Sequence, residues 1–211
     1  SLYLKENFKA PKQAANSEEK QNAELNESII KEILMLIEDN YDSYYGGFGV
    51  QPKFPPYDVV NFLLSYYKKT KQKKYLDIAL NTLDKMHEGI YDGIEGGFFR
   101  YSVTQDWKVP HYEKMLDTNA GMLKNYIGAF SITKSEEYKK FAESSLNFYI
   151  KNIDTDFGAY HFIMPEGIKE VRGSILDNSY LTLAFIEGYE ILKDENYIKT
   201  GKLLADYSLE N

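Results

Sequence analysis

Apolar residues along most of the chain recur three and four positions apart, which gives most such segments one apolar and one polar face, whereas residues 58–69 are apolar nearly all round. This spacing is typical of amphipathic α-helices. It predicts helices over residues 29–37, 58–69, 75–88, 119–131, 136–151, 178–192 and 196–209, with Asn26 as the N-cap of the first. No alternating pattern of a β-strand competes outside the loops.

The last six helices form three pairs with related sequences. The second helix of each pair has a tyrosine, a small residue four positions later, and an aliphatic residue four positions after that. The copies are Tyr75, Ala79 and Leu83, then Tyr138, Ala142 and Leu146, and more loosely Tyr197, Gly201 and Ala205. A small residue at the middle position allows a neighbouring helix to approach closely.

A glycine-containing loop precedes each pair. The segments "YDSYYGGF" (41–48), "YDGIEGGF" (91–98) and "IDTDFGAY" (153–160) share an aspartate, a glycine four residues later and an aromatic residue two further on. Internal similarity at intervals of 50 to 63 residues indicates stacked helical hairpins.

The connections alternate between short polar turns and these long loops, so the long loops should gather at one end of the hairpins. We therefore predict an all-α fold, an α/α toroid of the six-hairpin type, present as a partial ring of about seven helices with its glycine-rich loops on one face. Long loops gathered on a helical scaffold are a common place for a binding site. A partial ring leaves apolar helix faces open, which predicts self-association or a cleft.

Composition narrows the class of protein. The 211 residues suffice for one sizeable domain, and 19 tyrosines give an aromatic content of 15%. A net charge of −7 disfavours binding to nucleic acid, and no apolar run is long enough for a membrane span. The absence of cysteine excludes disulfides and thiol chemistry, and fits a cytoplasmic location.

The three histidines show no metal-ligand spacing, so we expect neither a metal nor a cofactor. Residues 1–25 are polar and carry no signal-peptide core, which predicts a linker-like segment before a toroid over 26–211. Because the chain begins with Ser1, we interpret it as a piece of a longer protein.

The segment "GGFFRYSVTQDWKVPHYEKM" (96–115) concentrates the reactive side chains. His111 is a potential base, and acids and a cation stand nearby as Asp106, Glu113, Lys114 and Asp117. The rings of Tyr101, Trp107 and Tyr112 could stack on the apolar face of a sugar, while Arg100 and the carboxylates bind its hydroxyl groups.

Two reaction classes fit these residues. Glycoside hydrolysis requires two carboxyl groups about 5 to 10 Å apart, and Asp42, Asp92 and Glu113 could supply such a pair from different loops. Epimerisation requires a base beside a carbonyl group, for which His111 is the natural choice. The sequence leaves both open.

Each of these residues also has a structural interpretation. Glu113 could begin a helix and interact with its dipole. Asp42 and Asp92 could form Asx turns before the glycines, and Trp107 could fill the core. We interpret His87 and His161 as incidental.

Two motifs carry a resemblance to a known family. "GGFGVQPKFP" (46–55) and "GGFFRYSVTQDWKVPHYEKML" (96–116), followed by Asn119-Ala120, resemble the YyaL-like, spermatogenesis-associated family of thioredoxin-domain-containing proteins. The resemblance covers roughly residues 27–131. It implies a toroid similar to N-acylglucosamine 2-epimerases and six-hairpin glycosidases, joined in the family to a thioredoxin-like domain that this chain lacks.

The resemblance also implies site residues. The family's signature loop maps onto Arg100, Tyr101, Trp107, Pro110, His111, Glu113, Lys114 and Asn119, and its earlier loop onto Gly46, Gly47, Phe48, Pro52, Lys53, Phe54 and Pro55. Where the family has Tyr-Asp before Asn-Ala, this chain has Asp117-Thr118, which turns the carboxylate by about 100° around a helix start.

Together these observations give two functional hypotheses. In the first, a carbohydrate-active toroid, hydrolase- or epimerase-like, binds a small sugar-like ligand. His111, Glu113, Asp42 and Asp92 would be catalytic; Arg100, Tyr101, Trp107, Lys114, Asn119, Lys53 and Phe48 would contact the ligand. In the second, the toroid is a non-catalytic scaffold that partners the thioredoxin-like domain of the full-length protein.

Overall fold

The computed structural model describes residues 27–172 and 174–210. The chain divides into two units, and the second, Ile37–Asn211, contains the hairpins and their loops. In the first unit, the described residues belong to helix α2 (Glu27–Asn40), which continues into the second. Asn26 and the predicted linker of residues 1–25 lie outside the described residues.

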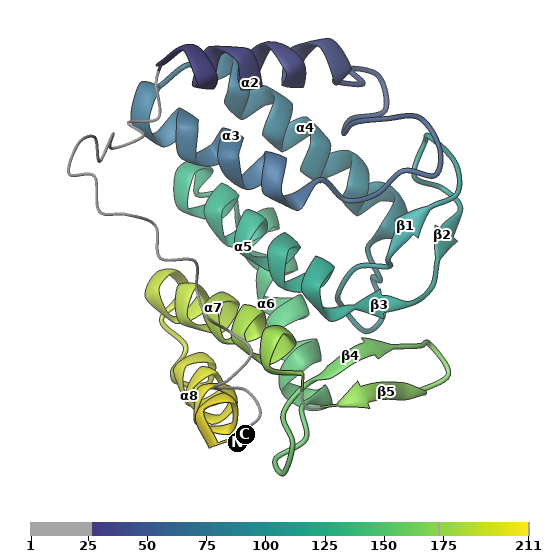
Figure 1. Cartoon of the computed structure of the whole chain (residues 1–211), viewed down its shortest axis with the longest axis vertical. Helices are drawn as coiled ribbons and strands as arrows, with labels where there is room; N and C mark the ends of the chain where they lie inside the picture. The colour runs from purple at the N-terminus through teal and green to yellow at the C-terminus, as the bar shows by residue number, and fades with distance from the viewer. Residues whose placement is uncertain (1–26, 173, 211) are drawn as a thin grey trace, which may run out of the picture. The chain divides into compact units, whose positions relative to one another are not determined.

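Six further helices form the three predicted pairs. They are α3 (Tyr57–Thr70) with α4 (Lys73–Ile90), α5 (Leu116–Thr133) with α6 (Glu136–Asn152), and α7 (Ile175–Leu192) with α8 (Glu195–Glu210). Helix α5 packs against both α3 and α7, so the first helices of the three pairs form a row. Helices α4, α6 and α8 pack against α3, α5 and α7 respectively. This alternation confirms the predicted α/α plan (Figure 1).

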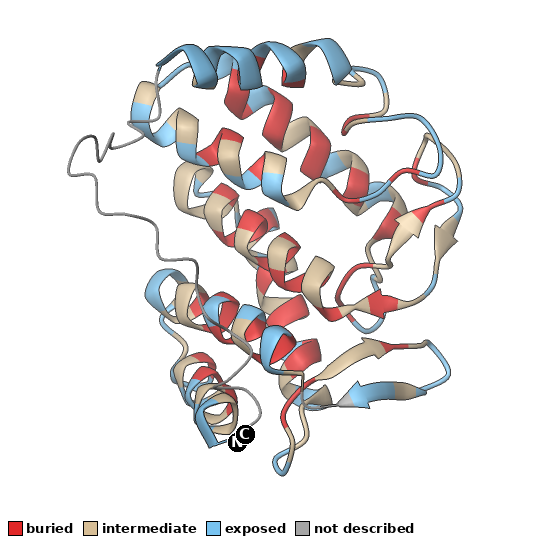
Figure 2. Cartoon of the chain, in the orientation of Figure 1, coloured by how far each residue is buried: buried red, intermediate tan, exposed pale blue. Residues whose placement is uncertain are grey.

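The repeated positions explain the packing of the pairs. The tyrosine and the small residue are buried in all three copies, as are Leu83 and Leu146 of the first two copies. Figure 2 shows buried residues gathering where the helices face one another.

Helix α7 is apolar nearly all round, which is the pattern of a helix with neighbours on several sides.

The three short turns are also built alike. Lys71, Lys134 and Lys193 each adopt the left-handed conformation directly after α3, α5 and α7. The backbone N–H of each lysine bonds to a carbonyl in the last turn of its helix, which satisfies a group that the helix leaves free. Since all three turns reverse the chain in this way, the long loops lie at the opposite end, as predicted (Figure 1).

The long loops contain short strands. In the loop before α5, β1 (Tyr101–Ser102) pairs with β2 (Pro110–His111). Strand β3 (Lys114–Met115) pairs antiparallel with β4 (Tyr160–Ile163), and β4 pairs with β5 (Lys169–Arg172) in the next loop. The sheet β3–β4–β5 therefore joins the second and third loops.

The alternative that Glu113 begins a helix is wrong, because α5 starts at Leu116. Lys114 and Met115 instead pair with β4, which keeps the chain extended up to the helix. Within the described ranges, none of the helices has the length and apolarity needed to cross a bilayer.

Candidate functional site

Each of the three loops begins with the same aspartate-centred turn. Asp42 accepts hydrogen bonds from the backbone N–H groups of Tyr44 and Tyr45, and Asp92 accepts them from Ile94 and Glu95. Asp154 accepts one from Asp156. These are Asx turns, so one carboxylate oxygen of each aspartate shapes its own loop.

The second oxygen of Asp42 bonds to a buried lysine. Lys53 is fully buried, and its Nζ lies 2.8 Å from Oδ2 of Asp42 and 3.2 Å from the carbonyl oxygen of Gln105. The side-chain amide of Gln105 also donates to Oδ2 of Asp42, at 2.8 Å. The Lys53 ammonium lies 5.3 Å from the ring centre of Trp107. The ion pair lies within the first loop, and its bonds to Gln105 tie this loop to the second.

Asp92 has the same arrangement in the second loop. Nζ of buried Lys114 lies 2.7 Å from Oδ2 of Asp92 and donates to the carbonyl oxygen of Gly96 at 2.9 Å. The ammonium also lies 3.2 Å from Oε2 of Glu95 and 4.1 Å from the ring centre of Phe148. Lys53 and Lys114, predicted as ligand contacts, therefore bond within the protein.

These pairs fix the charge of the two aspartates. Burial favours a raised pKa for Asp42, but hydrogen bonds from Lys53, the Tyr45 amide and Gln105, with the Lys53 charge, lower that pKa to about 2. Burial also opposes ionisation of Asp92, yet Lys114 and two backbone amides lower its pKa. Both groups are ionised at neutral pH, so neither has a proton to give as a general acid.

The low pKa of Asp42 predicts a loss of stability in acid. Because the folded-state pKa is below the unfolded value of about 3.9, the stabilisation is complete above pH 4 and disappears as the pH falls towards 2. It amounts to roughly 2 kcal/mol. We expect the free energy of unfolding of the Asp42→Asn variant to vary less between pH 5 and 2.5, as measured by urea titrations at each pH. An unchanged pH dependence would contradict this assignment.

Two further predicted contact residues lie in the interior. Asn119 is buried; its Oδ1 accepts from the Phe98 amide at 2.7 Å, and its Nδ2 donates to the carbonyl oxygens of Phe98 and Met115. Trp107 is also buried, and its indole N–H donates to the Tyr45 carbonyl oxygen at 2.9 Å. Gly47 has a φ of +76°, and a Cβ there would lie 2.8 Å from the Trp107 ring, so this glycine makes room for it.

A third group of predicted residues is partly exposed. Arg100 lies 2.7 Å from Oε2 of Glu113, and the same oxygen is 3.8 Å from Nδ1 of His111. The His111 ring stacks on Tyr101, with ring centres 4.9 Å apart, and Tyr101 in turn packs against Phe54. We call Arg100, Tyr101, His111 and Glu113 the loop cluster. The structure brings these four together, while Asp42 and Asp92 remain in their own ion pairs and Phe48 packs against Tyr41.

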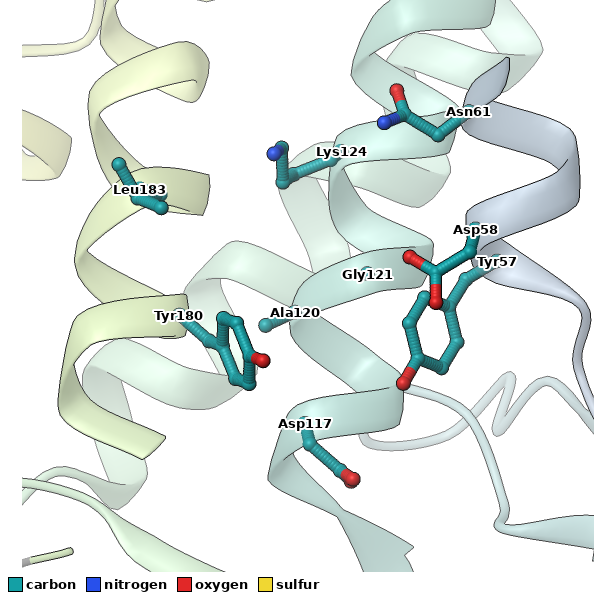
Figure 3. Close-up of a pocket in the computed structure, with 9 residues that line it drawn as sticks. All are labelled: Tyr57, Asp58, Asn61, Asp117, Ala120, Gly121, Lys124, Tyr180 and Leu183. Carbon is teal, nitrogen blue, oxygen red and sulfur yellow. The ribbon is translucent and has the colours of Figure 1, made fainter. Parts of the chain in front are cut away.

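A separate pocket of about 150 Å³ opens between α3, α5 and α7 (Figure 3). The side chains around it come from all three helices: Tyr57, Asp58, Asn61, Asp117, Ala120, Gly121, Lys124, Tyr180 and Leu183. In Figure 3 the rings of Tyr57 and Tyr180 stand on opposite sides, with Asp117 between them at one end and Lys124 at the other. Gly121 is part of the wall because a Cβ there would collide with the Tyr57 ring.

The pocket is acidic at the end near the loops. Asp58 and Asp117 lie in the first turns of α3 and α5, where a helix dipole favours negative charge. Burial raises the pKa of Tyr57, and the charges of Asp117 and Asp58 raise it further. Tyr57 therefore keeps its proton and can donate it in a hydrogen bond. Lys124 lies 3.2 Å from Glu187 at the other end.

Sequence reasoning missed this pocket. Its charged residues are Asp58, Lys124 and Asp117, which are single polar positions on the row-forming helices, and Asp117 stands where the chain departs from the family motif. Polar residues in the first turns of the row-forming helices were the sequence signal that could have indicated the pocket. In the described ranges, no group of three or more His, Asp or Glu is arranged to hold a metal ion.

The chain has relatives among known proteins. It is 35% identical over 150 residues to rat spermatogenesis-associated protein 20, and 34% identical over 130 residues to the human protein. These regions cover 66% and 59% of the chain, but 19% and 16% of the relatives. The chain is a homologue of spermatogenesis-associated protein 20. This confirms the family that the loop motifs indicated.

The chain thus spans about a fifth of the length of spermatogenesis-associated protein 20. No protein-family model matches it. The thioredoxin-like domain expected from the resemblance stays a prediction.

Solved structures confirm the fold. Cellobiose 2-epimerase from Spirochaeta thermophila superimposes with a TM-score of 0.75 at 15% identity, over 86% of this chain and 51% of the epimerase. A family 76 α-mannanase from Bacteroides thetaiotaomicron gives a TM-score of 0.68 at 20% identity, over 87% of this chain and 55% of the mannanase. The chain is therefore a partial α/α toroid, with the fold of carbohydrate-active enzymes.

Proposed function

We propose that this domain binds a small polyhydroxylated ligand, such as a mono- or disaccharide, in the pocket between α3, α5 and α7. The observation that carries the proposal is the composition of the pocket wall: two tyrosine rings stand on opposite sides, and the carboxylates of Asp58 and Asp117 and the ammonium of Lys124 border the space between them. Aromatic faces suit the apolar side of a sugar ring, and the charged groups suit its hydroxyls.

Size and fold support the same ligand class. A cavity of about 150 Å³ can accommodate a six-membered ring. The pocket lies at the loop end of the helices, as the first turns of α3 and α5 contribute to it. The structural neighbours include a sugar epimerase and a mannanase. We extend the ligand class from them to this chain and, as part of the same proposal, hydrolase- or epimerase-like chemistry for the whole protein.

The proposal changes the expected site. Asp58 and Asp117 take the place of Asp42 and Asp92 as the carboxylates facing the ligand, since the latter are neutralised by buried lysines. His111, Glu113, Arg100 and Tyr101 remain as the loop cluster, whose partly exposed side chains are available to a ligand that extends towards the loops.

The test is a thermal-shift screen of the full chain with D-glucose, D-mannose, cellobiose and mannobiose. A bound sugar at 100 times its Kd should stabilise the protein by about 2.7 kcal/mol. We expect Asp117→Asn and Tyr180→Ala to abolish this shift with little change in the Tm of the free protein, because both side chains border the open pocket. The matched controls are Asp206→Asn and Tyr44→Ala at exposed positions, which should keep the shift.

The second candidate function is a scaffold for the thioredoxin-like domain. It is favoured by the burial of Lys53 in the earlier loop and of Trp107, Lys114 and Asn119 in the signature loop, which gives much of both loops a structural role. The same screen separates the two functions: stabilisation by none of the sugars, in the full-length protein as well, would refute sugar binding and favour the scaffold.

A further inference from the structure

A histidine and a buried aspartate form a hydrogen-bonded pair outside the pocket and the loop cluster. Nδ1 of His161, on β4, lies 2.9 Å from Oδ2 of Asp177, in the first turn of α7. The Asp177 side chain is only 3% exposed, whereas that of His161 is 36% exposed. His161, which we interpret as incidental from the sequence, therefore bonds to a buried acceptor through one ring nitrogen and is partly exposed to solvent.

This contact determines which ring nitrogen is free. An ionised carboxylate only accepts hydrogen bonds, so Nδ1 of His161 must carry the hydrogen. In the neutral ring, Nε2 then has a lone pair and can accept a proton. The position of Asp177 is fixed in turn, because its backbone N–H donates to the Ser174 hydroxyl and its charge lies at a helix N-terminus.

His161 and Asp177 do not line the ligand pocket themselves, but both are linked through the backbone to residues that do. Phe162, the neighbour of His161, pairs with Met115, and Asp117 of the pocket follows Met115 by two residues. Asp177 precedes Tyr180 by three residues on α7, so the two side chains are neighbours on the helix surface. Helices α5 and α7 pack against each other, which brings their first turns together.

A buried tyrosine on α6 supports this placement. The hydroxyl of Tyr149, on α6, is buried and has no hydrogen-bond partner within the described part of the chain. Burial raises the pKa of Tyr149, and the charges of Asp117 and Asp177 raise it further. Both carboxylates are therefore near the same group.

We propose that His161 is the proton acceptor of the ligand pocket and that Asp177 is the positioning residue that holds its ring. This inference rests on the proposed function, since the proton donor is a hydroxyl group of the bound sugar. The hydroxyl proton moves to Nε2, and the electron pair of the broken O–H bond stays on the ligand oxygen. The positive charge of the imidazolium is offset by Asp177, and the proton returns by the reverse step.

The first experiment needs no ligand. The full chain is labelled with 15N-histidine, and the tautomer of each neutral ring is read from its nitrogen chemical shifts, with His161→Gln used to assign the signals. We expect His161 to be the Nδ1–H tautomer. In Asp177→Asn the side-chain amide can donate to Nδ1, so the ring should switch to the Nε2–H tautomer. A role confined to packing would leave the tautomer unchanged. A wild-type ring in the Nε2–H form would overturn the inference.

The second experiment links His161 to the pocket. A sugar that stabilises the full chain in the thermal-shift screen should shift the Nε2 signal of His161 and leave His87 unchanged, since the His87 ring stacks on Phe141 and Tyr91 elsewhere. Binding without a change at His161 would overturn this inference alone. If no sugar binds, the proposed function fails and the inference falls with it.

Discussion

Replacing Lys114 with methionine is expected to lower the free energy of unfolding by roughly 3–5 kcal/mol. The lysine is buried, and its ammonium is held by Asp92, Glu95 and the Gly96 carbonyl. Methionine preserves most of the side-chain volume but leaves the Asp92 carboxylate partly buried without its cation. The loss should be measured by urea unfolding, as a lower midpoint with an unchanged slope.

An exposed lysine in a similar pair provides the control. Lys73 lies 3.3 Å from Asp77 with both side chains largely in solvent, so Lys73→Met should change stability by less than about 0.5 kcal/mol. Adding Asp92→Asn to Lys114→Met should recover part of the loss, because it removes the uncompensated charge. A loss below about 1 kcal/mol for Lys114→Met would show that the pair is not essential to the loop.

Trp107→Ala is expected to cost roughly 3–5 kcal/mol as well, through a different mechanism. The indole is fully buried, bonds to the Tyr45 carbonyl and lies beside the Lys53 ammonium. Its removal leaves a cavity between the first and second loops. Urea unfolding gives the size of the loss, and faster amide hydrogen exchange in residues 41–56 and 91–115 should show where it acts.

This variant also separates the two interpretations of Trp107. If the ring is a stacking platform for a sugar, alanine should remove ligand binding and leave stability nearly unchanged. If the ring fills the core, stability falls as stated. Tyr112→Ala is the control, since Tyr112 is an exposed aromatic residue of the same loop and its loss should change stability little.

The sequence was sufficient to predict the helices, their pairing and the position of the loops. Helix periodicity and the Tyr75, Ala79 and Leu83 pattern are local signals, and they recur in each repeat. Because the connections alternate in length, the gathering of the loops at one end follows without knowledge of any contact. The helix pattern predicted the toroid, the family resemblance implied the same fold, and the structural neighbours confirm it.

The site was less predictable because its contacts are distant in sequence. Asp42 was assigned from its loop alone, but its environment comes from Lys53 and Gln105, and the latter is 63 residues away. The alternative that Glu113 begins a helix is wrong for a similar reason, because the strand that pairs with β3 lies almost 50 residues later. His161 and Asp177 likewise gain their significance only from their contact.

The hairpins contact one another in a chain, with α3 against α5 and α5 against α7. Such an arrangement behaves as a one-dimensional array, in which stability is a sum of unit terms and nearest-neighbour couplings. A defect in the α3–α4 hairpin should therefore be transmitted to α7–α8 through the intervening α5–α6 hairpin, and partial unfolding should advance from an end of the array, one hairpin at a time.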